Sequence, residues 1–199
     1  MHEPGQDISG EIDLEVLKRS FKTILQAIGE DPNREGLLRT PERASKSIAF
    51  FAKGYKMTIN DRSIQEGIFH GENIKDDLVV IKDIDFFSMC EHHMIPFFGH
   101  VSIGYVPDKK ILGLSKFARI VEIFSRRFQL QERLTDQIAQ AVEDVLSPKG
   151  VAVLVDAEHL CMVMRGVQKM DCSTITTSSL GCIKKERDLW ERFMKMTKK

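Results

Sequence analysis

The chain has 199 residues, and its 29 basic and 29 acidic residues leave no formal net charge. This balance argues against a general nucleic-acid or anionic-membrane binder. No apolar run approaches the roughly 20 residues that span a bilayer, and the N-terminus lacks the basic and apolar regions of a signal peptide. Four cysteines in a chain of this length do not indicate a disulfide framework. We therefore expect a reduced, cytoplasmic protein of one domain, or of one domain plus an appendage.

Helical periodicity dominates the first part of the chain. Apolar residues recur at helical spacing and predict an amphipathic helix over 12–29, which Gly29 is well placed to end. A second helix is expected with Thr40 as its N-cap and Pro41 at its first position. It should run almost to Gly54, which would stop it.

The character of the chain changes in its middle third. Two strand-like runs, 78–81 and 84–87, are followed by another over 98–105. We expect these strands to pair and to hold residues 90–93 in the connection between them, because functional groups often lie on loops held by such a scaffold.

Two further helices are expected in the second half. Ser115 is the expected N-cap of the first, and Arg126 and Arg127 are interpreted as its solvated end. Residues 129–132 are interpreted as a break, after which Thr135 can cap the next helix.

A buried strand is expected over 151–155, continuing through His159 and Cys161 to about Arg165. The Ser- and Thr-rich residues that follow suggest an edge strand over 173–179, and a short final helix is expected over 189–196.

Strands and helices do not alternate as βαβ units, so the expected class is α+β with an antiparallel sheet. The order of elements suggests an N-terminal helical segment over 1–60 and a catalytic domain over 61–199.

Cysteine and histidine gather in two places. Cys90 and His93 are three residues apart and can reach one metal ion, and Cys161 could be a third ligand. If the strand continued, His159 would share a face with Cys161. Two such groups favour a catalytic zinc site with an open position, although a closed structural site with His159 as fourth ligand is an alternative. Cys172 and Cys182 have no histidine neighbour and are interpreted as ordinary thiols.

The neighbouring polar residues allow more than one role. Glu91 could be an acid–base group or a partner that orients a ligand, and His92 could be a general acid or a surface residue. Ser115, Lys116 and Arg119 at a helix start could hold phosphate, or they could be ordinary surface residues.

Arg165 is a further candidate for phosphate. Glu132 could accept two N–H bonds from a guanine edge, although a role as helix cap is the alternative.

Taken together, these segments closely resemble the GTP cyclohydrolase I family over roughly residues 15–190. The motifs that carry the resemblance are 36–43 (GLLRTPER), 90–99 (CEHHMIPFFG), 103–107 (IGYVP), 113–122 (GLSKFARIVE), 131–135 (QERLT) and 158–166 (EHLCMVMRG). The resemblance implies the tunnelling fold, an antiparallel sheet with helices on one face, assembled into a toroidal homodecamer with active sites between subunits. It also implies zinc-dependent conversion of GTP and water to 7,8-dihydroneopterin triphosphate and formate, the first step of tetrahydrofolate and pterin biosynthesis.

The same resemblance implies a role for each matching residue. Cys90, His93 and Cys161 would hold zinc, which activates the water that attacks C8 of guanine. His159 would protonate N7, and His92 would transfer protons in later steps. The guanine would be read by Gln131 and Glu132. The triphosphate would contact Ser115, Lys116, Arg119, Arg165 and, from a neighbouring subunit, Arg43.

Two other classes of function were weighed. A non-catalytic zinc- and GTP-binding homologue on the same ring scaffold would bind without turnover, but such a protein would have no need of the histidine proton donors. A zinc deaminase is disfavoured, because the P-C-x-x-C part of the signature of those enzymes does not occur in the chain.

Overall fold

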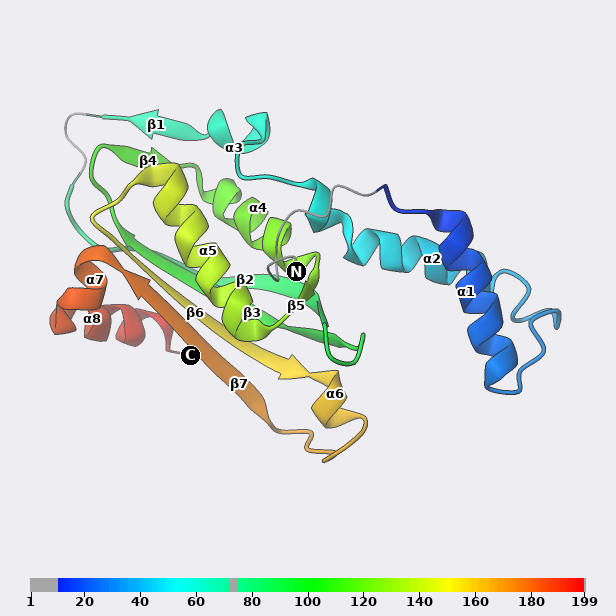
Figure 1. Ribbon diagram of the computed structural model, residues 1–199. Coiled ribbons are helices and arrows are strands. Elements are labelled where there is room, and N and C mark those ends of the chain that lie inside the picture. The colour runs from blue at the N-terminus through cyan, green and yellow to red at the C-terminus, as the bar shows by residue number, and fades with distance from the viewer. Residues whose placement is uncertain (1–10, 72–74, 199) are drawn as a thin grey trace, which may run out of the picture.

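The computed structural model describes residues 11–71 and 75–198 and shows a five-stranded sheet flanked by helices (Figure 1). Neighbouring strands are antiparallel, except for the short parallel pair of β2 with β5. The strand order is β5 (Phe128–Gln129), β2 (Val79–Cys90), β3 (Pro96–Val106), β6 (Gly150–His159) and β7 (Ser173–Leu180). The expected α+β class with an antiparallel sheet is confirmed.

The remaining elements surround this sheet. A separate two-stranded ribbon pairs β1 (Ile68–His70) with β4 (Lys110–Leu112). The helices are α1 (Leu14–Ala27), α2 (Thr40–Phe51), the 3₁₀ turn η1 (Lys53–Lys56), α3 (Arg62–Gln65), α4 (Leu114–Ser125), α5 (Gln131–Leu146), α6 (Leu160–Val163), α7 (Gly181–Lys185) and α8 (Arg187–Thr197).

The main core lies between the large sheet and the two long helices α4 and α5, which cover one of its faces (Figure 1). Side chains alternate between the two faces along a strand. In β6, Val151, Val153 and Val155 are fully buried and belong to the core under the helices. This is the layer arrangement that the family resemblance implies.

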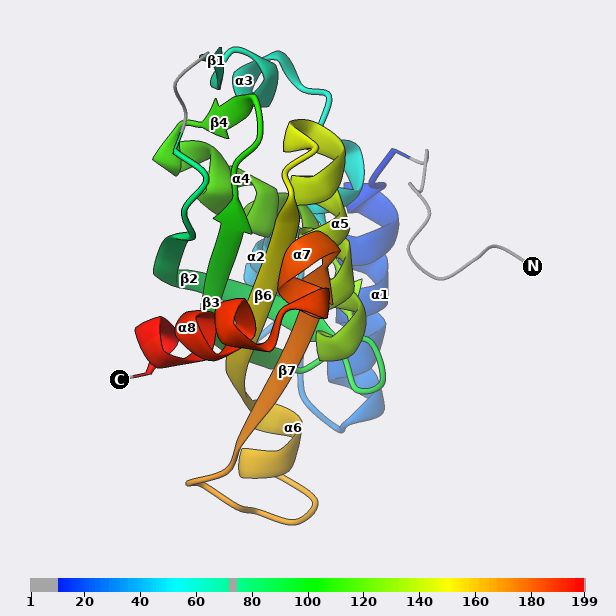
Figure 2. The same cartoon turned by 90° about the vertical axis from the view of Figure 1, so that its left-hand side faces the viewer.

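A smaller core lies on the opposite face, where α8 covers one end of the sheet (Figure 2). Phe193 of α8 is fully buried there and packs in one cluster with Leu78 and Ala152. Gly104 of β3 makes this approach possible, because a Cβ at that position would lie 2.6 Å from the Phe193 ring.

The N-terminal helices α1 and α2 form a hairpin, here called the arm, that extends away from the sheet (Figures 1 and 2). Every residue of α1 is at least partly exposed, and Val16 and Ile24 keep 45% and 51% of their surface. The expected helix over 12–29 is confirmed, and a domain boundary at residue 60 remains a prediction.

Gly54 joins the arm to the part of the chain that contains the large sheet. It lies in η1, just after α2, and its backbone N–H donates to Arg126 O at 2.9 Å. A Cβ at Gly54 would lie 2.3 Å from Ile123 O, so only glycine permits this contact with the end of α4.

Arg127 strengthens the same junction from the other side. Its side chain is only 4% exposed, and its Nε donates to the carbonyl oxygens of Gly54 and Ile123 at 3.1 and 2.9 Å. The Phe128 N–H donates to the Tyr55 hydroxyl at 3.1 Å. The interpretation of this arginine as a solvated helix end is therefore wrong, because backbone carbonyls hold its guanidinium inside the protein.

Three expected helix starts are displaced. The residue before α2 is Arg39, so Thr40 is already helical, and the residue before α4 is Gly113, so Ser115 is its second residue. Thr135 lies one turn inside α5, where its hydroxyl donates 2.7 Å back to the carbonyl four residues earlier. This bond replaces the capping role that we expected for it.

The expectation that this strand continues to Arg165 is also wrong, because β6 ends at His159 and the short helix α6 follows. The expected pairing of β2 with β3 and the expected edge strand β7 are confirmed. Of residues 90–93, which were expected in the connection, Cys90 is the last residue of β2, and residues 91–93 lie in the turn that follows. Within the described ranges, no helix combines the length and the apolar character needed to cross a bilayer.

Candidate metal and active site

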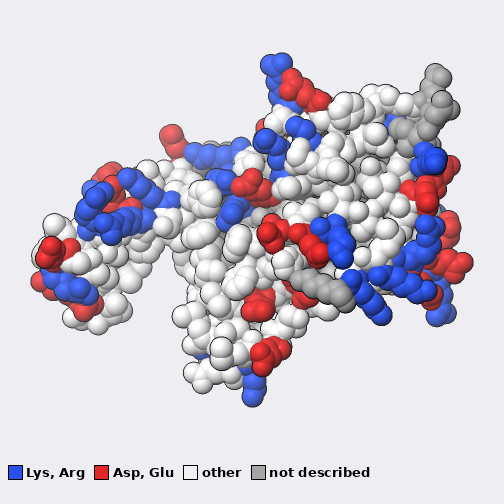
Figure 3. Space-filling view, turned by 180° about the vertical axis from the view of Figure 1, so that it is seen from behind, with Lys and Arg blue, Asp and Glu red and all other residues white. Residues whose placement is uncertain are grey.

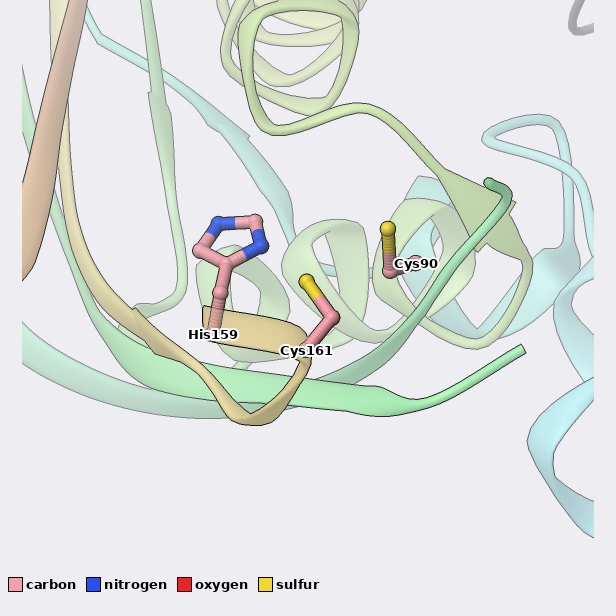
Figure 4. A group of neighbouring side chains, drawn as sticks. All are labelled: Cys90, His159 and Cys161. Carbon is pink, nitrogen blue, oxygen red and sulfur yellow. The ribbon is translucent and has the colours of Figure 1, made fainter. Parts of the chain in front are cut away.

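Two thiols and one imidazole meet at one end of the large sheet. They belong to Cys90 at the end of β2, His159 at the end of β6 and Cys161 in α6 (Figure 4). The sulfur and ring-nitrogen atoms all lie within 4.8 Å of one another. Thiolate and imidazole donors at this separation suit a borderline-soft transition metal.

The register of the sheet explains why these residues meet. Phe97 of β3 is paired with Ser88 of β2 on one side and with His159 of β6 on the other. Cys90 and Cys161 each lie two residues beyond those partners. Because β6 gives way to α6 at this point, Cys161 does not continue away along a strand but lies beside the other two.

His159 is held in one orientation. Its ring stacks on that of the fully buried Phe97, with a centroid distance of 4.5 Å and an interplanar angle of 6°. Its Nε2 lies 2.8 Å from Gln131 Oε1. Burial lowers the pKa of the imidazole, while the negative charge of Glu132 acts in the opposite direction.

The turn after β2 carries the other two candidate site histidines, His92 and His93. The Cys90 N–H donates to Ile95 O at 2.9 Å, and Met94 closes the turn with a left-handed φ of 53°. His93 is exposed, and its Nδ1 lies 3.8 Å from Cys90 Sγ. His92 is also exposed. His93 is thus adjacent to the Cys90 thiol, whereas His159 forms the compact group with both Cys90 and Cys161.

An ion pair between Glu91 and Arg133 holds this turn against α5. Arg133 pairs with Glu91 through Nη2 and donates from Nε to Gln129 Oε1 at 3.0 Å. The Glu91 N–H donates to Gln129 O at 3.1 Å, and the Gln129 amide donates to Phe124 O and Gln137 Oε1. No functional role was predicted from the sequence for Gln129 or for Arg133, although Arg133 lies within the 131–135 motif.

Arg165 acts electrostatically on the Cys161 thiol. Burial and the adjacent Cys90 raise the pKa of the Cys161 thiol, whereas the positive charge of Arg165 lowers it. Met164 and Met170 of the loop that follows α6 are 64% and 74% exposed. Basic and acidic side chains are interspersed over the face of the molecule that Figure 3 shows.

The other candidate phosphate contacts lie away from the thiols of the same chain. Ser115, Lys116 and Arg119 are in the first turns of α4, whereas the far end of α4 leads into β5, which pairs with Cys90. The intervening helix is about 15 Å long at 1.5 Å per residue. Arg43 is exposed on α2 in the arm.

Gln131 and Glu132 begin α5 beside His159, but their side chains differ. Glu132 is exposed, whereas Gln131 is only 2% exposed and its amide bonds to the protein interior. The structure therefore brings Cys90, His159 and Cys161 together and leaves the remaining site assignments as predictions.

An α+β protein with two thiols and imidazoles converging at the end of its sheet has the features of a metal-dependent enzyme. The chain matches the family model described as GTP cyclohydrolase I over residues 17–198, so it belongs to the GTP cyclohydrolase I family. The relatives named GTP cyclohydrolase 1 from Rattus norvegicus and Homo sapiens are each 51% identical over 96% of this chain, covering 78% and 75% of their own lengths. The relative of the same name from Chlorobium phaeovibrioides is 50% identical over 91% of this chain and 79% of its own.

A solved structure of the archaeosine synthase QueF-Like in the apo form also overlaps this chain. It is 21% identical, covers 54% of this chain and 96% of its own, and has a TM-score of 0.44. The expectation of an enzyme of the GTP cyclohydrolase I family is confirmed by the family match and the sequence relatives.

Proposed function

We propose that this protein is a zinc-dependent GTP cyclohydrolase I that converts GTP and water to 7,8-dihydroneopterin triphosphate and formate in the cytoplasm. The observation that carries the proposal is the convergence of Cys90, His159 and Cys161 within 4.8 Å in a chain of this family. Among the described residues, these two sulfur atoms and one ring nitrogen are donor atoms of the kinds that bind zinc in proteins.

The residues fit zinc because Cys90 and Cys161 supply two thiolates, and His93, the ligand implied by the resemblance, supplies the nitrogen. Bound zinc would supply Lewis acidity, which makes water a nucleophile near neutral pH. His159 lies beside the thiols, where it can hold a proton for N7 of guanine. Protonation of N7 makes C8 a better electrophile. We assign later proton transfers to His92, which is exposed on the same turn.

Glu132 is the candidate reader of guanine. Its carboxylate is exposed in the first turn of α5 and lies close enough to His159 to act on that ring's pKa. A carboxylate accepts two N–H bonds and therefore matches guanine, whose edge offers a pair of donors.

A second copy of the chain would complete the site. Arg165 is close to Cys161, but Ser115, Lys116 and Arg119 are separated from the thiols by the length of α4. We propose that these residues and Arg43 of the arm bind triphosphate across subunit interfaces of a homodecamer. The exposed apolar side chains of α1 support assembly, because they would be covered by a neighbour.

The direct test is to incubate reduced, zinc-loaded protein with GTP and to follow formate and pterin together. Both should rise, both should stop on chelation, and His159→Ala should abolish formate release without loss of the fold. Intact GTP at full zinc occupancy would instead favour the non-catalytic homologue. A matched variant away from the site, His70→Ala on the ribbon strand β1, should retain activity.

A further inference from the structure

The amide of Gln131 is fully engaged inside the protein. Its Nε2 carries two hydrogens and lies within hydrogen-bond distance of three acceptors: Thr174 O at 2.8 Å, Val155 O at 3.2 Å and Thr176 Oγ1 at 3.2 Å. Its Oε1 lies 2.8 Å from His159 Nε2. The side chain therefore joins the first turn of α5 to β6, β7 and the imidazole at once.

These contacts determine which way round the amide lies. Two of its partners are backbone carbonyls, those of Val155 and Thr174, and a carbonyl can only accept a hydrogen bond. The NH₂ group must therefore face the strands, and the oxygen must face the imidazole. The usual ambiguity of a glutamine amide is removed here by the chemistry of its neighbours.

The orientation of the amide in turn determines the tautomer of His159. An amide oxygen accepts, so His159 Nε2 must carry a hydrogen. The other ring nitrogen, Nδ1, then has the free lone pair in the neutral ring. Figure 4 shows a ring nitrogen directed toward the sulfurs of Cys90 and Cys161, and this must be Nδ1 because Nε2 is bound to Gln131.

We propose that Gln131 is a positioning residue that fixes His159 as the Nε2–H tautomer, with Nε2 donating to the Gln131 amide oxygen and Nδ1 directed toward the thiols. This inference rests on the proposed function and replaces a guanine-reading role for the Gln131 side chain. Reading guanine would require the amide to leave its three acceptors on β6 and β7. The side chain of the next residue, Glu132, is exposed and would not have to leave buried acceptors in order to bind guanine.

The ring is held from a second direction by its parallel stacking on Phe97. The stacking fixes the plane of the imidazole, and Gln131 fixes its rotation within that plane. A general acid must be placed within hydrogen-bond reach of the atom that it protonates, so both constraints serve the same end.

The tautomer can be measured without any change at Gln131. The chain has six histidines, so His159 can be assigned in sedimented, histidine-labelled, zinc-loaded protein by its loss in His159→Asn. Solid-state ¹⁵N NMR at neutral pH should show a protonated Nε2. A protonated Nδ1 with a bare Nε2 would overturn the proposal, whether or not the protein releases formate.

The kinetic test compares neighbouring variants. Gln131→Met keeps the side-chain volume but removes the acceptor, so formate release at saturating GTP should fall on the order of 10²-fold, the scale of a lost general acid, with KM little changed. Glu132→Gln should instead raise KM for GTP. A raised KM with unchanged kcat in Gln131→Met would show that this residue reads the substrate and would refute the positioning role.

Thr176→Val provides a milder variant if Gln131→Met does not fold. It removes one of the three acceptors of the Gln131 amide and leaves both carbonyls in place. It should lower kcat by a smaller factor than Gln131→Met, again without raising KM. Wild-type protein that releases no formate would refute the proposed function, while the NMR result would still decide the tautomer.

Discussion

The ion pair between Arg133 and Glu91 should control how tightly the protein holds its metal. Glu91 follows Cys90 directly, and its pairing with Arg133 fixes the start of the turn that also carries His93. The two side chains are 17% and 33% exposed, so the pair is partly protected from water. Replacing Arg133 by methionine would leave the Glu91 carboxylate and the Gln129 amide oxygen without this donor.

The size of the effect follows from the bonds that are lost. Hydrogen bonds to charged groups contribute about 1.5–3 kcal/mol each, and about 1.4 kcal/mol corresponds to a tenfold change in affinity. If one such bond holds the turn in its ligand-bearing form, Arg133→Met should weaken zinc binding about ten- to a hundredfold. This is also the range found when partners of metal ligands are removed.

Competition with a chromogenic zinc chelator at neutral pH measures this change directly. Arg187→Met is the matched control, because it removes an arginine from an exposed pair with Glu191 on α8, far along the chain from the thiols. It should leave zinc affinity unchanged. Equal zinc retention by wild type, Arg133→Met and Arg187→Met would refute the reasoning.

Three other changes have definite expected outcomes. Gly54→Ala should destabilise the fold by about 1–3 kcal/mol in urea unfolding, because its Cβ would overlap backbone oxygens, whereas Gly36→Ala meets only a flexible arginine and should cost less. Cys161→Ser should abolish stoichiometric zinc binding by elemental analysis, and Cys172→Ser should retain it. Burial raises the pKa of Glu143, so the unfolded chain loses this proton first and stability falls as the pH rises from the unfolded to the folded pKa. Glu143→Gln should remove that loss in denaturation curves across pH; parallel curves for the two proteins would contradict this.

The large elements were predictable because their signals are local. The spacing of apolar residues predicts the helices α1, α4 and α8. The strand-like runs predict β2 and β3 with the Cys/His-containing turn next to them. The thiols were also visible as motif residues. Their convergence depends on β3 pairing with both β2 and β6, which sequence patterns suggest only in part.

The errors arise where distant parts of the chain decide a residue's role. Arg127 follows another arginine at a helix end and has the local pattern of a surface charge, yet the carbonyl oxygens of Gly54 and Ile123 hold it inside the protein. The hydrogen-bond partners of Gln131 were not predictable for the same reason, because they come from strands 24 to 45 residues away, and its expected contact with guanine stays a prediction. The end of β6 at His159 is likewise not marked, because the residues of α6 are apolar and continue the strand pattern.

The two-residue strand β5 links the base of the arm to Cys90. Its first residue, Phe128, is bonded to Tyr55 at the base of the arm, and its second, Gln129, pairs with Cys90. In the assembly proposed above, a neighbouring subunit that displaced the arm would act on Cys90, a proposed zinc ligand, through these two residues. We therefore expect variants with a damaged arm to lose zinc together with their oligomeric state.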